Sequence, residues 1–287
     1  MGEDQVDSVR RVSRRLRDLV EPLAANVYFA PEARAAYQHL GIEDYGAGYF
    51  TSRGACLGHV PGHVVAAAFG VFNPDVVVPA VAEGWSKTDV GSILAAREQG
   101  AVASLERILG GEPAGLRRAT ELLGRAADAA PVGGRPLFAG LSSLGFPGTP
   151  LGDLWRAADL VREHRGDSHN AAWVAHGVDA IEITLLTELW WRIPLRSYVY
   201  TRGWDQEQVD AAVERLESVG AMAGDTLTDQ GQDLRASIEH STDRGERAVV
   251  EALGDDAGEL FGILEPMAKA IVAAGGYPTD PSTLTRR

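Results

Sequence analysis

The chain has 287 residues, of which 45% are hydrophobic and 23% are charged. This composition excludes collagen-like, disordered and disulfide-rich proteins, and a chain of this length is expected to form about two domains. Asp and Glu number 40 against 27 Lys and Arg, so the formal net charge is −13. DNA or another polyanion would be repelled on average, and would need a strong local basic patch in order to bind.

The cysteine content and the hydropathy pattern limit where the protein works. The single cysteine, Cys56, excludes an intramolecular disulfide and a cysteine-based zinc finger. No apolar run approaches the roughly 18 residues of a membrane-spanning helix. The first residues are charged throughout and lack the apolar stretch of a signal peptide. We therefore expect a cytoplasmic protein with no membrane partner.

The first half of the chain predicts a series of helices. Apolar residues recur at helical spacing, prolines stand at helix starts, and glycines stand at helix ends. Helices are expected at about 4–24, 31–41, 45–57, 61–72, 74–84, 88–109 and 113–130. Segment 131–150 is dense in Gly and Pro and is the best linker candidate. It would separate an N-terminal winged-helix-like domain, 1–130, from a C-terminal MarR-like winged-helix domain, 151–287.

The second half predicts more helices and one hairpin. The helices are expected at about 151–164, 168–177, 179–192, 194–200, 205–219, 229–242 and 246–274. Gly220–Thr228 predicts a hairpin, because Gly-Asp lies there between short apolar flanks. Helices followed by a small hairpin and another helix are typical of a winged helix-turn-helix.

The two halves repeat one another weakly. Val60-Pro61 and Ile193-Pro194 each begin a helix, and a third helix follows in both halves. Thr88-Asp89 and Thr228-Asp229 then begin helices that contain an arginine. We therefore predict an all-α fold with a small β-wing, made of two tandem degenerate winged-helix units. The first half shows no convincing wing strands.

Two sets of residues carry a resemblance to known families. Segment 227–235 follows the pattern LT-x-x-G-x-x-L-R and resembles the segment after the wing of MarR-type regulators. Nearly the whole chain resembles an actinobacterial family of tandem winged-helix proteins that are described only as helix-turn-helix proteins. The matching residues are Gly48-Tyr49-Phe50, Arg53, Leu57-Gly58, Phe72-Asn73-Pro74, 162–167, His169 and Arg202-Gly203-Trp204. Ser168 and Asn170 depart from the family pattern, in which a small or apolar residue is expected at these positions. The resemblance implies the fold and secures no reaction.

The charge of the expected recognition helix argues against DNA binding in the usual mode. Helix 205–219 has a single basic residue, Arg215, and five carboxylates, those of Asp205, Glu207, Asp210, Glu214 and Glu217. The wing adds Asp225 and no basic residue. The one basic run, 10–17, is expected to pair with neighbouring carboxylates, and the alternative is a patch for nucleic acid or an acidic partner.

The densest polar run, 162–169, allows two interpretations. In the first it joins two helices, and Asp167 or Ser168 caps the second. In the second, His164, Asp167 and His169 face a cavity between the domains and form a catalytic set, because imidazole and carboxylate suit acid–base chemistry. The same groups also suit a metal, and a haem held by one histidine is conceivable. No spacing matches a strong metal motif, so neither a metal nor a cofactor is assigned.

Four further residues complete the candidate ligand site. Arg53 and Arg165 would hold an anionic group, and Tyr49 and Trp173 would form aromatic walls. The alternatives are an internal ion pair for Arg53 and core positions for the aromatic residues. We expect the protein to bind a small molecule or cofactor in the interdomain cleft, and whether a reaction follows is open. The alternatives are a MarR-like DNA-binding regulator, which can form a homodimer through its terminal helices, and an interaction protein without a pocket.

Overall fold

The computed structural model describes residues 3–278, and nearly all of its regular structure is helical. The helices are α1 (Glu3–Ala25), α2 (Pro31–His39), α3 (Tyr45–Gly54), α4 (Gly62–Phe69), α5 (Pro74–Lys87), α6 (Val90–Leu109), α7 (Leu116–Asp128), α8 (Pro136–Ser142), α9 (Pro150–Ala175), α10 (Ala180–Trp191), α11 (Gln206–Ser218), α12 (Asp229–Gly245), α13 (Arg247–Leu253) and α14 (Ala257–Ala273). Strands β1 (Met222–Ala223) and β2 (Thr226–Leu227) form an antiparallel hairpin, in which Met222 pairs with Leu227. The predicted fold class, all-α with a small β-wing, is confirmed.

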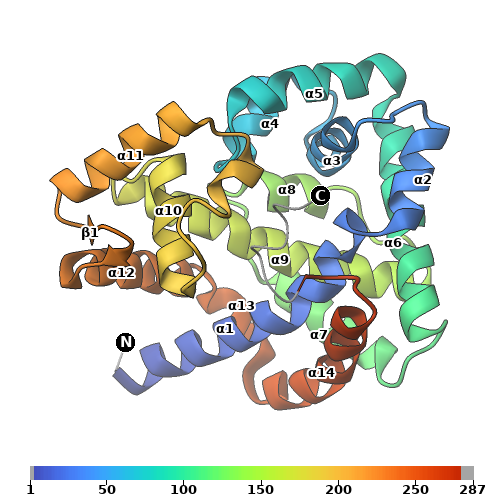
Figure 1. Cartoon of the computed structure of the whole chain (residues 1–287). Coiled ribbons are helices and arrows are strands. Elements are labelled where there is room, and N and C mark those ends of the chain that lie inside the picture. Colours follow the sequence, from blue (N-terminus) through green and yellow to red (C-terminus); the bar gives the residue numbers. More distant parts are fainter. Residues whose placement is uncertain (1–2, 279–287) are drawn as a thin grey trace.

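Helix α9 crosses the centre of the molecule (Figure 1). The prediction of two helices, 151–164 and 168–177, is wrong, because α9 is continuous over 26 residues. The polar run 162–169 lies in its middle, and neither Asp167 nor Ser168 is a helix cap. The run stays helical and buried because its polar side chains form hydrogen bonds and ion pairs with neighbouring elements. These contacts replace the hydrogen bonds that water would provide in a loop.

Two apolar clusters pack along α9. The larger cluster contains residues from 16–161 and from 249–271, so α13 and α14 pack with the N-terminal helices. The smaller cluster contains residues from 172–238, including the C-terminal end of α9 and the core of α10 and α11. Segment 131–150 contributes α8 to the larger cluster, in which Leu137, Phe138 and Leu141 are buried. The predicted linker therefore supplies part of the core.

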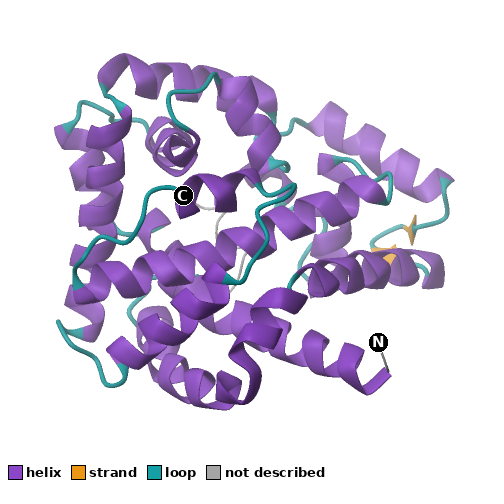
Figure 2. Ribbon diagram, turned by 180° about the vertical axis from the view of Figure 1, so that it is seen from behind, coloured by secondary structure: helices purple, strands orange, loops and turns teal. Residues whose placement is uncertain are grey.

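The winged-helix arrangement lies in the second half of the chain. Helices α10 and α11 are followed by the hairpin and by α12, and Figure 2 shows the hairpin beside α12. The helix predicted at 194–200 is instead a turn followed by a 3₁₀ turn, η3 (Val199–Arg202). The buried Glu188 carboxylate accepts backbone N–H bonds from Arg196, Tyr198 and Val199 at 2.5–2.7 Å. These bonds hold the segment in a non-helical course.

The described residues contain no helix that is both long and apolar enough to span a bilayer.

The close packing of α2 against α6 depends on a glycine. A Cβ at Gly100 would lie 2.3 Å from the Cα of Ala33, so Gly100→Ala forces the two helices apart. We expect this variant to lose about 1–3 kcal/mol of unfolding free energy in urea denaturation. The control is Gly262→Ala in α14, where an added Cβ meets nothing within 4 Å. It should keep or raise stability by about 0.5–1 kcal/mol, since alanine favours the helix. Equal effects of the two changes would contradict this account of the contact.

Candidate functional site

A cavity of about 280 Å³ lies where α1, α3, α4, α9, α10 and α12 meet. This volume is near the lower end for small-molecule sites, about 300–1,000 Å³. Its wall contains three glutamates and six arginines, namely Arg17, Arg53, Arg162, Arg165, Arg202 and Arg235. Aromatic rings from α3, the α4–α5 region and α10 form much of the remaining wall. The cavity therefore combines an excess of positive charge with apolar surface.

The structure brings four of the seven sequence-predicted site residues to this cavity. Tyr49, Arg53, Arg165 and His169 line its wall. The others, His164, Asp167 and Trp173, are buried outside the lining. Trp173 belongs to the smaller apolar cluster and donates its indole N–H to Asn170 at 3.2 Å.

His164 is held in the interior behind the cavity wall. Its Nδ1 lies 2.9 Å from the carboxylate of Glu246, and its ring packs edge-on against Phe138. The hydroxyl of Ser168 also contacts Glu246, at 2.8 Å. The Nε2 atom of His164 is buried without a hydrogen-bond partner among the described residues. This histidine therefore has no access to a ligand in the cavity.

Asp167 holds the start of α8. Its Oδ2 accepts the backbone N–H of Phe138 at 3.0 Å. Burial raises the pKa of Asp167 from its ordinary value of 3.8 to about 7, and its other oxygen has no partner among the described residues. The side chain links α9 to α8 and lies outside the cavity wall.

Arg53 both pairs internally and faces the cavity. Its Nε and Nη2 donate to Glu163 at 2.8 and 2.7 Å, and its Nη1 donates to the hydroxyl of Tyr49 at 3.2 Å. Its guanidinium lies 4.2 Å from the ring centre of Phe69. Although burial opposes ionisation of Glu163, the charges of Arg53 and Arg162 hold its pKa at about 2. Arg53 therefore forms an internal ion pair and also lines the cavity, so the two interpretations from the sequence do not exclude each other.

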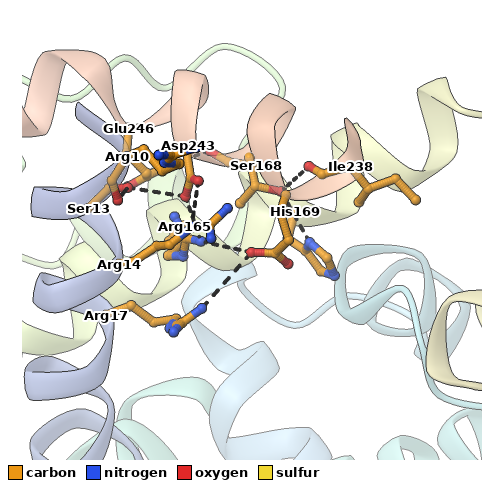
Figure 3. Close-up of polar contacts among 12 residues, drawn as sticks. Arg10, Ser13, Arg14, Arg17, Arg165, Ser168, His169, Ile238, Asp243 and Glu246 are labelled. Atoms are coloured by element: carbon orange, nitrogen blue, oxygen red, sulfur yellow. Dashed lines mark hydrogen bonds and ion pairs between the residues drawn. The ribbon is translucent and has the colours of Figure 1, made fainter. Parts of the chain in front are cut away.

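Another part of the cavity wall belongs to an ion network between α1, α9 and α12 (Figure 3). Arg165 lies 3.0 Å from Asp243 and 3.4 Å from Glu239. Arg14 also binds Asp243, at 2.8 Å, and Arg17 lies 4.0 Å from Glu239. Much of the basic run 10–17 is thus neutralised within the molecule. The local pairs Arg10–Asp7 and Arg17–Asp18 are of the expected kind, whereas Asp243 and Glu239 of α12 are partners that the sequence did not indicate.

Arg202 lines the cavity and was not among the candidate site residues selected from the sequence. Five of the six cavity arginines lie within 4.0 Å of a carboxylate. Arg202 has no such partner among the described residues, and its Nε is buried without a hydrogen bond. Its guanidinium lies 4.2 Å from the ring centre of Tyr198 and 4.6 Å from that of Phe72. Burial, together with the charge of Arg53, lowers its pKa to about 10, so it stays cationic at neutral pH.

The backbone around Arg202 is fixed by the α4–α5 connection. The N–H of Asn73 donates to the carbonyl of Arg202 at 2.9 Å, and the Asn73 amide donates to that of Gly203 at 3.0 Å. The indole of Trp204 donates to the carbonyl of Val71 at 2.9 Å. These bonds join the winged helix to the N-terminal helices and place Arg202 over Phe72.

The remaining options from the sequence concern metals and DNA. Within residues 3–278, no group of three His, Cys, Asp or Glu side chains is placed to hold a metal ion.

On α11, the carboxylates of Glu207 and Glu214 are exposed, and Arg215 binds Asp179 and Glu182 at the start of α10. Arg196 binds Asp210 at 2.6 Å. The basic side chains next to the expected recognition helix are therefore already neutralised.

The raised pKa of Asp167 predicts a pH-dependent stability. The Asp167 carboxyl binds its proton more tightly in the folded state than in the unfolded state. The stabilisation that protonated Asp167 gives the folded state is therefore complete below pH 3.8 and is lost as pH rises through about 7. Across this window, Asp167 should lower the unfolding free energy by up to about 1.4 kcal/mol per pH unit. Asp167→Asn should show a shallower decrease in urea denaturation. Asp225→Asn, in the exposed wing, is the control and should keep the wild-type slope. Equal slopes for all three proteins would contradict the assignment.

The comparisons with known proteins agree with the architecture. No curated protein and no solved structure gives a significant match to the chain. The profile of a helix-turn-helix family matches residues 13–278, which is nearly all of the chain and includes every residue that lines the cavity. The expected relation to helix-turn-helix proteins is confirmed at this level. The chain therefore belongs to this helix-turn-helix family.

Proposed function

We propose that this protein binds a small organic anion in the central cavity, with Arg202 as the anchoring cation. The observation that carries the proposal is the absence of a carboxylate partner for Arg202 among the described residues, although its neighbours on the cavity wall have one. Arg202 is half-buried, and its Nε is fully buried without a hydrogen bond. Partial removal of a cation from water without an anion is costly. A carboxylate or phosphate in the cavity would remove this cost, and a guanidinium suits both groups.

The shape of the wall supports a ligand with a flat apolar body. The rings of Tyr49, Phe69, Phe72 and Trp191 line the same cavity as Arg202. Phe69 and Phe72 are 6.1 Å apart, and they carry the guanidinium groups of Arg53 and Arg202 respectively. An anionic group at Arg202 would therefore lie close to a second cation and next to aromatic surface. Arylcarboxylates combine these features.

Arg202→Met tests the anchor. Binding of benzoate, phenylacetate and phenylpropionate, measured by calorimetry, should weaken about tenfold or more, because a hydrogen bond to a charged group contributes about 1.5–3 kcal/mol. Stability should change by less than about 1 kcal/mol, because Arg202 gives up only its contacts with two rings.

Arg192→Met is the matched control. Arg192 begins the connection that leads from α10 to η3, but it is exposed and outside the cavity wall, so its replacement should leave binding unchanged. Failure of all three acids to bind the wild-type protein would contradict the proposed function. Equal loss in both variants would contradict the role of Arg202.

A DNA-binding regulator is the second candidate, and membership of the helix-turn-helix family favours it. A relation to MarR-type regulators would rest on segment 227–235, in which Thr228 caps α12 by accepting the N–H of Gly231. The exposed carboxylates of α11 and the pairing of Arg196 and Arg215 oppose it, because groove binding depends on phosphate contacts.

A mobility-shift assay separates the two candidates. We expect no sequence-specific complex with the DNA upstream of the gene at physiological salt, because α11 would repel the phosphates. The triple variant Glu207→Gln, Asp210→Asn and Glu214→Gln should bind DNA non-specifically more tightly than the wild type does. A specific wild-type complex at physiological salt would favour the regulator.

A further inference from the structure

The hydrogen bonds of His169 fix which of its ring nitrogens carries the proton. The Nδ1 atom lies 3.2 Å from the hydroxyl oxygen of Thr242. Thr242 donates its only hydroxyl proton to the carbonyl of Ile238 at 2.9 Å, because a carbonyl can only accept. The oxygen of Thr242 therefore accepts from Nδ1–H of His169. In the neutral ring this leaves a lone pair on Nε2.

This lone pair is available to the cavity. His169 lines the wall, and Figure 3 shows the second ring nitrogen pointing away from α12. No described residue lies within hydrogen-bonding distance of Nε2, and the atom is not sealed in the interior. A ligand group can therefore reach it.

The charges around the ring keep it neutral. Burial, and then the positive charge of Arg235, lower the pKa of His169 to about 4; Arg165 and Arg17 act in the same direction, and Glu239 opposes them. The imidazole is therefore a hydrogen-bond acceptor at neutral pH, in a cavity whose arginines can only donate.

A second acceptor lies on the α10 wall. The hydroxyl of Thr184 donates to the carbonyl of Ala180 at 2.8 Å, so its oxygen can only accept from a ligand. The three glutamates of the wall already have partners in Arg162, His164 and Arg165. Apart from them, the cavity has two kinds of polar wall. Cations on α3 and η3 suit an anion, and acceptors on α9 and α10 suit an O–H or N–H donor.

We infer that the ligand is a hydroxyl-bearing organic anion, whose hydroxyl donates to Nε2 of His169 while its anionic group binds Arg202. This inference rests on the proposed function and adds the class of ligand. It assigns His169 as a specificity-determining residue. A site built to accept a hydrogen bond rejects an analogue that lacks the donor, because the acceptor is then buried without a partner.

Pairs of acids in which a methyl group replaces the hydroxyl proton of one member test the inference. The probes are para-hydroxybenzoate, para-hydroxyphenylacetate and para-hydroxyphenylpropionate, each compared by calorimetry with its para-methoxy analogue. We expect the best-fitting hydroxy acid to bind about tenfold or more tightly than its methoxy partner. His169→Phe should abolish this preference, and His169→Gln should restore part of it, because the glutamine oxygen can replace Nε2 as acceptor.

A second measurement needs no ligand. Nitrogen NMR of the histidine side chains should show His169 as the neutral Nδ1–H form at neutral pH. A protonated ring or the Nε2–H form would overturn the inference and leave the proposed anion site intact. Equal binding within every hydroxy and methoxy pair would do the same. Absence of binding by all of the acids would instead contradict the proposed function, and this inference with it.

Discussion

The structure depends on the pairing of the charged side chains that α9 buries. Asp159 binds Arg97 of α6 at 2.9 Å, and Glu163 binds Arg53 of α3. On another face of α9, Arg165 binds Asp243 of α12. Removal of one member of a buried pair typically costs about 3–5 kcal/mol, because the other member keeps its charge without a partner. The pairs therefore fix the positions of three helices around α9.

The same pairs create the charge imbalance of the cavity. Glu163 and Glu239 neutralise the arginines that flank them, and no described carboxylate remains within reach of Arg202. Two aromatic rings hold Arg202 in place of an anion. The scaffold thus presents a positioned cation beside apolar surface, and His169 adds an acceptor on another wall. This division of polar groups underlies both proposals.

Local patterns in the sequence were sufficient for much of the fold. Gly-Asp between apolar flanks located the wing at 220–228, and the carboxylates of 205–219 already showed that α11 is acidic. The pattern of 162–169 was misleading, because a polar run inside a buried helix has the same composition as a loop. The partners of this run lie about 80–110 positions away in the sequence, so local composition and periodicity cannot reveal them.

The sequence indicated only some of the residues that line the cavity, for the same reason. Arg53 and His169 line the cavity, because α3 and α9 both form part of its wall. Arg202 was not selected, because its importance comes from the lack of a partner, and only the packing of η3 over Phe72 reveals that lack. His164 belongs to the same polar run as His169, but it faces Glu246 from the interior and does not line the cavity itself. Orientation around a helix, rather than residue type, separates these two histidines.

The packing of α1 has a consequence for biosynthesis. This helix is made before the other described helices, and its apolar residues, including Leu16, Leu19 and Leu23, pack in a cluster with α9 and α14. The part of this apolar stripe that α14 covers therefore stays exposed until residues up to about Ile271 have left the ribosome. Uncovered apolar surface on a nascent chain attracts chaperones and aggregates readily. Without α14, part of this apolar stripe has no cover within the fold.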